Sequence, residues 1–215
     1  MVKCNFITLF LFDLAEKFEL NIEALYIKII VMNELHIKLQ NYSSTYPEEI
    51  VTKTKMLEFL NKYDNPFSRD LQIGHFTASA FLLNNDKTKF LLMHHRKLDK
   101  WLQPGGHCDG DSNILNVAVK EAIEESGINE IKTINKEIFD IDTHYIPQTH
   151  KEPAHYHYDV RFLLKTVDND NFIKNNESNE LKWFNFSDYS KLDIELERSV
   201  TRMIEKFMKI NHPAC

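Results

Sequence analysis

Three glutamates, Glu121, Glu124 and Glu125, lie on a helix-like segment that follows a glycine turn. At about 100° per residue they gather on one side of a helix, while the apolar residues of the segment fall on the opposite side. Like charges three and four residues apart repel one another, and a bound cation would remove that repulsion. Hard cations such as Mg²⁺ and Mn²⁺ prefer carboxylate and carbonyl oxygens, and the Gly105-Gly106 turn brings a backbone carbonyl towards the same patch. The residues therefore indicate a divalent-metal site, with a solvated acidic helix face as the alternative.

The helix that carries these carboxylates is expected to span Asn113 to Ser126. Asp111 or Ser112 is its expected N-cap, because both side chains accept hydrogen bonds from free backbone N–H groups of a first turn. Gly127 is expected to end the helix, because glycine adopts the left-handed conformation without steric cost. Both end signals agree with one short helix directly behind the glycine turn.

The glycines, the glutamates and the closing Gly127-Ile128 together resemble the Nudix box. The pattern of that box is Gly, five residues, Glu, seven residues, then Arg-Glu-apolar-x-Glu-Glu-x-Gly-apolar. Gly106 matches the first glycine, and the residues from Glu121 onwards match the end of the pattern as written. Two positions depart from it, because Ser112 stands where the family has Glu and Lys120 stands where it has Arg.

The resemblance implies a metal-dependent hydrolase that cleaves a diphosphate linkage in a nucleoside diphosphate joined to another group. The implied cofactor is Mg²⁺ or Mn²⁺, held by the Gly105 carbonyl and by Glu121, Glu124 and Glu125. Glu121 and Glu125 are the implied catalytic carboxylates closest to the chemistry. A small-molecule nucleotide is the implied substrate.

The departures at Ser112 and Lys120 concern residues that, in the family, support the metal-binding glutamates. Lysine is a point charge without the planar fork of arginine, so it neutralises an acidic cluster but holds no carboxylate through two parallel hydrogen bonds. We therefore expect looser support of the glutamates, with Asp109 or Asp111 as a candidate replacement anion. The rival interpretation is a Nudix-fold nucleotide-binding module or regulator with weak or no catalysis.

A further carboxylate from the loop before the last core strand serves many relatives as metal ligand or general base. Glu177 and Glu180 lie in that loop of this chain, and we expect Glu177 to take the catalytic role. Glu152 is the second candidate. A base must come within hydrogen-bond reach of the attacking water, and the alternative is that all three are ordinary solvated acids.

Alternating polar residues mark two later segments, Asp140–His144 and His155–Asp159. The period of two places each set of three side chains on one face of a sheet. We expect four of them to contact the substrate: His144, His155, His157 and Asp159. The alternatives are satisfied structural hydrogen bonds and a second metal site.

The elements that must position these residues follow from periodicity and turn residues. Expected strands are His75–Leu83, Lys89–His95, Trp101–Gln103, Ile134–Ile146, Ala154–Val167 and Leu181–Phe186. Expected helices are Phe6–Leu39 with a break, Pro47–Tyr63, and a last amphipathic helix through Leu196–Phe207. This α/β (α+β) order matches the αβα sandwich around a mixed sheet that the resemblance implies. We expect an N-terminal helical extension at residues 1–70 and a Nudix domain at residues 71–215.

Composition narrows the functional classes. The net charge of −6 gives no broad attraction to nucleic acid. No apolar run approaches the roughly 20 residues that span a bilayer, so we expect no membrane partner. The cysteines Cys4, Cys108 and Cys215 are odd in number and scattered, which favours a reducing compartment and a cytoplasmic location. The sequence leaves the oligomeric state open, a homodimer included.

Overall fold

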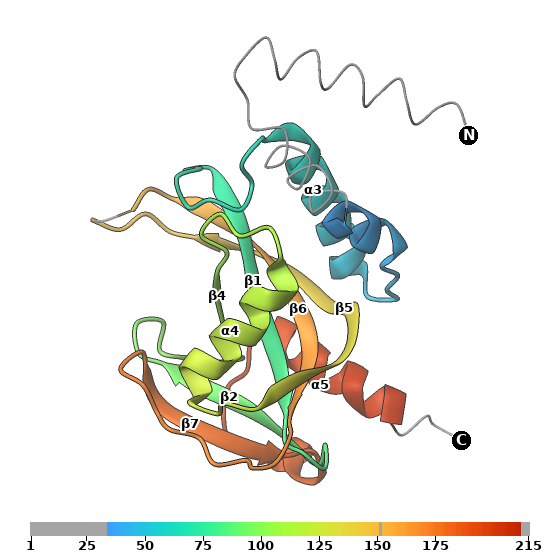
Figure 1. The fold of residues 1–215 in the computed structure, drawn as a ribbon, viewed down its shortest axis with the longest axis vertical. Coiled ribbons are helices and arrows are strands. Elements are labelled where there is room, and N and C mark those ends of the chain that lie inside the picture. Colours follow the sequence, from blue (N-terminus) through green and yellow to red (C-terminus); the bar gives the residue numbers. More distant parts are fainter. Residues whose placement is uncertain (1–33, 151, 212–215) are drawn as a thin grey trace.

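The computed structural model describes residues 34–150 and 152–211, and a seven-stranded sheet lies at its centre (Figure 1). Residues 34–41 are helical, and the rest of the helical pattern expected at Phe6–Leu39 lies outside the described residues. The helices are α3 (Pro47–Lys62), α4 (Ile114–Ser126), the 3-10 helix η1 (Phe186–Lys191) and α5 (Arg198–Asn211). The strands are β1 (Gly74–Leu83), β2 (Lys89–His95), β3 (Lys100–Leu102), β4 (Gly105–His107), β5 (Ile131–Ile146), β6 (His155–Thr166) and β7 (Ser178–Asn185).

The sheet is mixed, with the strand order β3-β2-β1-β6-β5. β1 and β6 run parallel over ten residues of each strand, and β5 pairs with β6 in the antiparallel sense. β4 adds to β1 beside Thr77, whereas β2 pairs with β1 at Leu83 and carries β7 on its other side. β1 is therefore the central strand, and it is buried along its whole length.

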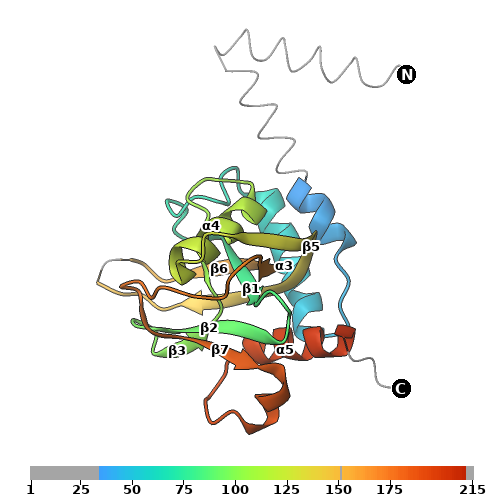
Figure 2. The same cartoon turned by 60° about the horizontal axis from the view of Figure 1, so that its bottom comes forward.

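Helices cover both faces of this sheet, as Figure 2 shows for α4 on one side and α5 on the other. The period of two sends alternate β1 side chains to opposite faces. Phe76 and Leu82 join the apolar cluster under α4, while Phe81 joins the cluster under α5. The expected αβα sandwich around a mixed sheet is confirmed.

The helix of the glutamates begins one residue later than expected. Its N-cap is Asn113, whose side-chain oxygen accepts a hydrogen bond from the Asn116 N–H at 3.3 Å. The prediction of Asp111 or Ser112 was wrong, because Asp111 instead accepts from the backbone N–H of Asn113 at 2.8 Å. Gly127 ends the helix with φ of +68°, as predicted.

The glycine turn is itself a strand, which the sequence pattern did not predict. Gly105, Gly106 and His107 form β4 and pair with β1, and the strand expected at Trp101–Gln103 is observed as Lys100–Leu102. Hydrogen bonds to a neighbouring strand define such short strands, and three residues carry too little periodicity to reveal them. β7 begins at Ser178, inside a polar segment expected to be a loop, because its first residues pair with β2 and carry no apolar alternation.

The described part of the expected N-terminal extension packs directly on the sheet. Leu35, Leu39, Met56 and Phe59 belong to the same apolar cluster as Phe76 of β1. Burial of such side chains contributes about 1.5–3 kcal/mol each. Residues 34–70 therefore share a hydrophobic core with the strands that follow them.

A buried ionic network ties the same segment to β5 and α5. Glu49 of α3 is 0% exposed, accepts a hydrogen bond from the Ile141 N–H at 3.2 Å and pairs with Lys206. Lys206 also contacts Asp140 at 2.8 Å, and Arg202 Nη2 lies 2.7 Å from Asp140 Oδ1. Asp140, one of the alternating polar residues of β5, is thus a structural carboxylate.

Replacing Glu49 with alanine is expected to lower the free energy of unfolding by about 3 kcal/mol. The substitution leaves a buried lysine with one anionic partner fewer, and breaking a buried ion pair has an effect of that size. Urea unfolding followed by circular dichroism measures it. Glu58→Ala is the matched control, because Glu58 is exposed on the same helix; equal effects of the two substitutions would contradict the prediction.

Candidate active site

Glu121 and Glu125 extend from α4 onto the glycine strand β4. The Gly105 N–H donates a hydrogen bond to Glu125 Oε2 at 2.8 Å. The Glu121 carboxylate lies over Gly106, where it fills the space that a Cβ atom would take. Glu124 is exposed one turn along the helix from Lys120, whose Nζ lies 3.7 Å from Glu124 Oε1. Two of the three predicted glutamates, Glu121 and Glu125, therefore lie at β4, and Glu124 lies on the exposed side of the same helix.

The electrostatics of this patch favour a cation. Burial raises the pKa of Glu125 to about 8, although the hydrogen bond from the Gly105 N–H lowers it. The charges of Glu121, Glu177 and Glu124 raise it further. Burial also raises the pKa of Glu121, and Lys120 only partly offsets it. Ionised carboxylates are therefore disfavoured here until positive charge arrives.

The register of β4 explains how a backbone carbonyl reaches the same patch. Gly106 lies opposite Ala78, and the Ala80 N–H donates to the Pro104 carbonyl at 2.8 Å. In an antiparallel pair such bonded positions alternate with residues whose N–H and C=O point away from the partner strand. Gly105 is such a residue, so its carbonyl lies on the same strand edge as the N–H that binds Glu125.

Replacing Gly106 with alanine is expected to lower kcat by about 100-fold while the fold is retained. The new methyl group overlaps the Glu121 carboxylate, so that carboxylate must leave its position. Steady-state kinetics with Mg²⁺ measures the change, and circular dichroism checks the fold. A variant with wild-type kcat would show that the Glu121 position does not matter.

Of the three glutamates, Lys120 pairs with Glu124 only, and the looser support expected from Ser112 and Lys120 stays a prediction. Among the described residues Ser112 makes no side-chain hydrogen bond or ion pair, and Lys120 is exposed. Asp109, a candidate replacement anion, instead accepts two hydrogen bonds from Arg69, one on each carboxylate oxygen. The sequence did not predict the pairing of Arg69 with Asp109, because no local pattern near Arg69 indicates a partner forty residues further along the chain.

The candidate bases lie on different sides of the site. Glu177 immediately precedes β7, and its charge acts on both Glu121 and Glu125. Glu152 instead borders a cavity of about 260 Å³ together with His107 and His155, and its charge acts on His107. Glu177 is therefore the candidate associated with the glutamates of α4.

The histidines of β5 and β6 do gather, but on the other face of the sheet. In the parallel register His75 of β1 lies beside His157, and the ring centroids of His144 and His157 are 5.2 Å apart. His75 alternates with Phe76, which packs under α4, so the histidines face away from that helix. His107 of β4 completes the group, with its ring centroid 4.9 Å from that of His157.

Asp159 is held inside the structure. It is 2% exposed, and its oxygens accept hydrogen bonds from four side chains. These donors are Thr77 at 3.0 Å, Ser79 at 2.7 Å, Gln103 at 3.3 Å and Arg161 at 2.7 Å. The geometry supports a structural hydrogen-bonding role for Asp159 rather than substrate contact. Both of its carboxylate oxygens are buried and already accept hydrogen bonds from protein side chains.

Burial disfavours the charged form of three imidazoles of the group, those of His75, His107 and His157. Burial lowers the pKa of His157 to about 2, with further lowering by His144, His107, His75 and His155. Burial also lowers the pKa of His75 to about 4, and the charges of His107 and His155 lower it further. Sequence reasoning missed His75 and His107, since only the register of β1 with β4 and β6 brings them to the group.

A mixed sheet lies between helices, and two carboxylates of one helix, Glu121 and Glu125, lie against a glycine strand. The model of the NUDIX domain matches residues 74–207. A probable DHNTP pyrophosphohydrolase of Lactococcus lactis subsp. cremoris (strain MG1363) is 31% identical over 121 residues, which are 55% of this chain and 69% of that protein. An RNA pyrophosphohydrolase of Ruthia magnifica subsp. Calyptogena magnifica is 27% identical over 126 residues, which are 56% of this chain and 69% of that protein.

A solved structure shows the same fold. The crystal structure of a C. elegans Ap4A hydrolase binary complex aligns with a TM-score of 0.50 at 18% identity, over 63% of this chain and 96% of that chain. The matching domain, the glutamates of α4 and these relatives together place the chain among enzymes of the pyrophosphohydrolase type. The chain belongs to the Nudix family.

Among the described residues, no helix is long and apolar enough to cross a membrane.

Proposed function

We propose that this enzyme hydrolyses a diphosphate linkage in a nucleoside diphosphate joined to another group, with Mg²⁺ or Mn²⁺ as cofactor. One observation carries the proposal: Glu121 and Glu125 both lie against β4, where the Gly105 N–H holds Glu125 at 2.8 Å. The two pyrophosphohydrolase relatives support the same reaction class. Cleavage releases a nucleoside monophosphate and the phosphorylated second group.

The residues present fit a hard divalent cation. The buried carboxylate of Glu125 has a raised pKa beside the charges of Glu121 and Glu124, and the nearest lysine is exposed. Oxygen ligands of this kind suit Mg²⁺ and Mn²⁺, and we assign the three glutamates and the Gly105 carbonyl as ligands. When bound, the cation screens the diphosphate oxygens and lowers the pKa of a bound water.

Glu121, Glu125 and Glu177 are the proposed catalytic residues. The Gly105 hydrogen bond fixes one oxygen of Glu125, which leaves the other to face the reacting groups. Glu177 is close enough for its charge to act on both glutamates, and we assign it as the base that takes the proton of the attacking water. Glu152 lies with the histidines and is the weaker candidate.

His144 is the proposed substrate contact among the predicted histidines. It is half-buried, and its Nδ1 lies 3.5 Å from Asp142 Oδ2, which orients the ring. An imidazole so held donates a hydrogen bond to phosphate or sugar oxygens. His155 and His157 are not assigned as substrate contacts, because they lie on the sheet face away from the glutamates of α4.

The proposed partner is a small-molecule nucleotide rather than nucleic acid. The net charge of −6 supports this assignment, since it repels a polyanion. A cytoplasmic location is proposed from the scattered cysteines Cys4, Cys108 and Cys215. A homodimer is tested by light scattering of the purified protein.

A nucleotide-binding regulator is the second candidate, because Ser112 and Lys120 replace the supporting pair of the family box. The double variant Ser112→Glu/Lys120→Arg tests it. For an enzyme with loosened support, the double variant is expected to raise kcat by about 10-fold, because arginine holds a carboxylate bidentately. Each single variant is the control. If the wild type is inactive and the double variant shows no increase in kcat, the regulator is favoured.

The direct test is a panel of nucleoside diphosphates joined to sugars, nucleosides or other groups, assayed with Mg²⁺ and with Mn²⁺. The expected result is release of a nucleoside monophosphate from at least one member, and loss of that activity with a chelator. Tight binding of a panel member without hydrolysis under either metal would overturn the proposal.

A further inference from the structure

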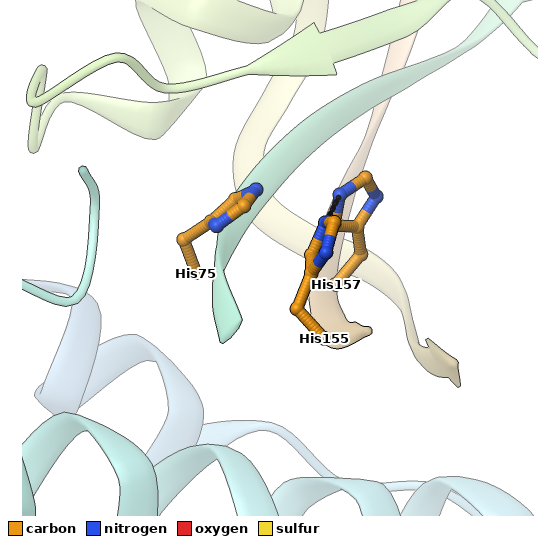
Figure 3. Close-up of side chains that lie close together, drawn as sticks. All are labelled: His75, His155 and His157. Carbon is orange, nitrogen blue, oxygen red and sulfur yellow. Dashed lines mark hydrogen bonds between the residues drawn. The ribbon is translucent and has the colours of Figure 1, made fainter. Parts of the chain in front are cut away.

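We propose that His75, His155 and His157 bind one transition-metal ion of the Zn²⁺ type, at a site separate from the carboxylates of α4. The three side chains come from β1 and β6 and are close together in Figure 3. One ligand nitrogen from each lies within 4.8 Å of the others. Imidazole nitrogen is the ligand that Zn²⁺, Ni²⁺ and Cu²⁺ accept readily and that Mg²⁺ does not.

The sheet itself builds this site. His75 and His157 are direct neighbours in the parallel register of β1 and β6, so their side chains leave the same face side by side. His155 precedes His157 by two residues and therefore points to that face as well. Strand positions are more rigid than loops, and such rigidity is what a preorganised metal site needs.

His75 supplies the observation that points to a ligand. Its side chain is 3% exposed, and among the described residues neither ring nitrogen has a hydrogen-bond partner of normal geometry. Buried polar nitrogens are almost always paired, because an unpaired one loses its contact with water and gains nothing. A metal ion bound to one nitrogen satisfies that atom without any change of fold.

His155 is held in the tautomer that binds metal through Nε2. Its Nδ1 lies 2.8 Å from the Pro153 carbonyl, which only accepts, so Nδ1 carries the hydrogen and Nε2 presents a lone pair. Such a hydrogen bond from the far ring nitrogen is the usual support of a metal-binding histidine. That lone pair faces His157 Nε2 at 3.0 Å. Two nitrogens on one tetrahedral Zn²⁺ lie about 3.3 Å apart, so a small rotation of the rings admits the ion.

The surroundings leave a fourth position open. A cavity of about 260 Å³ borders His75 and His155 and is also lined by Arg69, His107 and Glu152. The proposed ion can take a water molecule as its fourth ligand from that side. Three protein ligands with an open fourth position are typical of zinc sites that bind a further ligand.

Cobalt titration of the metal-depleted full-length protein tests the site. The expected result is one Co²⁺ per chain, with visible absorption bands of a nitrogen-ligated ion that Zn²⁺ abolishes and excess Mg²⁺ does not. The double variant Glu124→Gln/Glu125→Gln is expected to keep these bands. Bands that vanish in the double variant would place the ion at α4, and a wild-type protein without such bands would overturn the inference.

Two further measurements identify the ligands. His75→Ala is expected to weaken Co²⁺ binding at least 100-fold, whereas His94→Ala, a half-buried histidine on β2, leaves it unchanged. X-ray absorption of the Zn²⁺-loaded wild type needs no variant, and it is expected to show three imidazole nitrogens at about 2.0–2.1 Å. An all-oxygen shell would overturn the inference. Because these readouts are binding and spectroscopy, they stand apart from the hydrolase proposal.

Discussion

Replacing Glu125 with glutamine is expected to lower the rate of diphosphate hydrolysis by at least about 10³-fold, which corresponds to about 4 kcal/mol of transition-state stabilisation. One oxygen of Glu125 is held on β4 by the Gly105 N–H. Glutamine keeps the shape and the accepting oxygen but removes the negative charge that holds the cation and faces the attacking water. Single-turnover kinetics with saturating Mg²⁺ on the substrate found in the panel measures the loss.

Two further variants accompany that experiment. Glu124→Gln is expected to give a similar loss, because Glu124 belongs to the same ligand set. Glu130→Gln is the matched control, since Glu130 is exposed just beyond α4. A Glu125→Gln enzyme with more than a tenth of wild-type activity would remove Glu125 from the proposed catalytic residues.

The stability of the same variant separates a chemical effect from misfolding. In the metal-free protein the pKa of Glu125 is raised to about 8, so the folded state holds its proton more tightly than the unfolded state does. Wild-type stability therefore falls as pH rises from about 4.5 towards 8, by an amount of order 4 kcal/mol. The neutral amide of Glu125→Gln carries no such penalty, so the metal-free variant is expected to be at least as stable as wild type at pH 8.

Replacing Glu177 with glutamine is expected to lower kcat by about 10²–10³-fold with little change in KM. Loss of a general base has an effect of that size, because the attacking water then keeps its proton in the transition state. Substrate and cation binding are expected to persist, since the ligands on α4 are untouched. Steady-state kinetics with Mg²⁺ separates kcat from KM.

Glu180→Gln is the control for Glu177, because Glu180 lies three residues further on and is exposed within β7. It is expected to leave kcat within twofold of wild type. Glu152→Gln tests the second candidate base on the histidine side of the sheet. A large fall of kcat with Glu152→Gln and none with Glu177→Gln would transfer the role of base to Glu152.

The zinc-type site and the carboxylate site differ in the ligands they offer. The histidines of β1 and β6 lie on the sheet face away from α4, whereas Glu121 and Glu125 lie under that helix. Oxygen and nitrogen ligands select different ions from the same solution. Assays of hydrolysis therefore need Mg²⁺ or Mn²⁺ varied while the histidine site is held either loaded or depleted.

The sequence by itself determined the helix of the glutamates and the patch that Glu121 and Glu125 form. Gly127 ended that helix where expected, and the i,i+4 spacing of Glu121 and Glu125 brought two carboxylates to one patch. These features depend on residues within one or two turns of each other, so local propensity and period suffice to predict them. The mixed sheet between helices was expected from the resemblance to the Nudix family, whose αβα sandwich the order of elements matches.

Only the tertiary structure decided which distant residues meet. The parallel register of β1 with β6 places His75 beside His157, and it surrounds Asp159 with hydrogen-bond donors. The pairing of Arg69 with Asp109 joins segments forty residues apart. Such contacts depend on strand pairing and on the packing of helices against the sheet, which no local period encodes. The carboxylate chemistry is therefore readable along the chain, whereas the histidine site exists only where two parallel strands lie side by side.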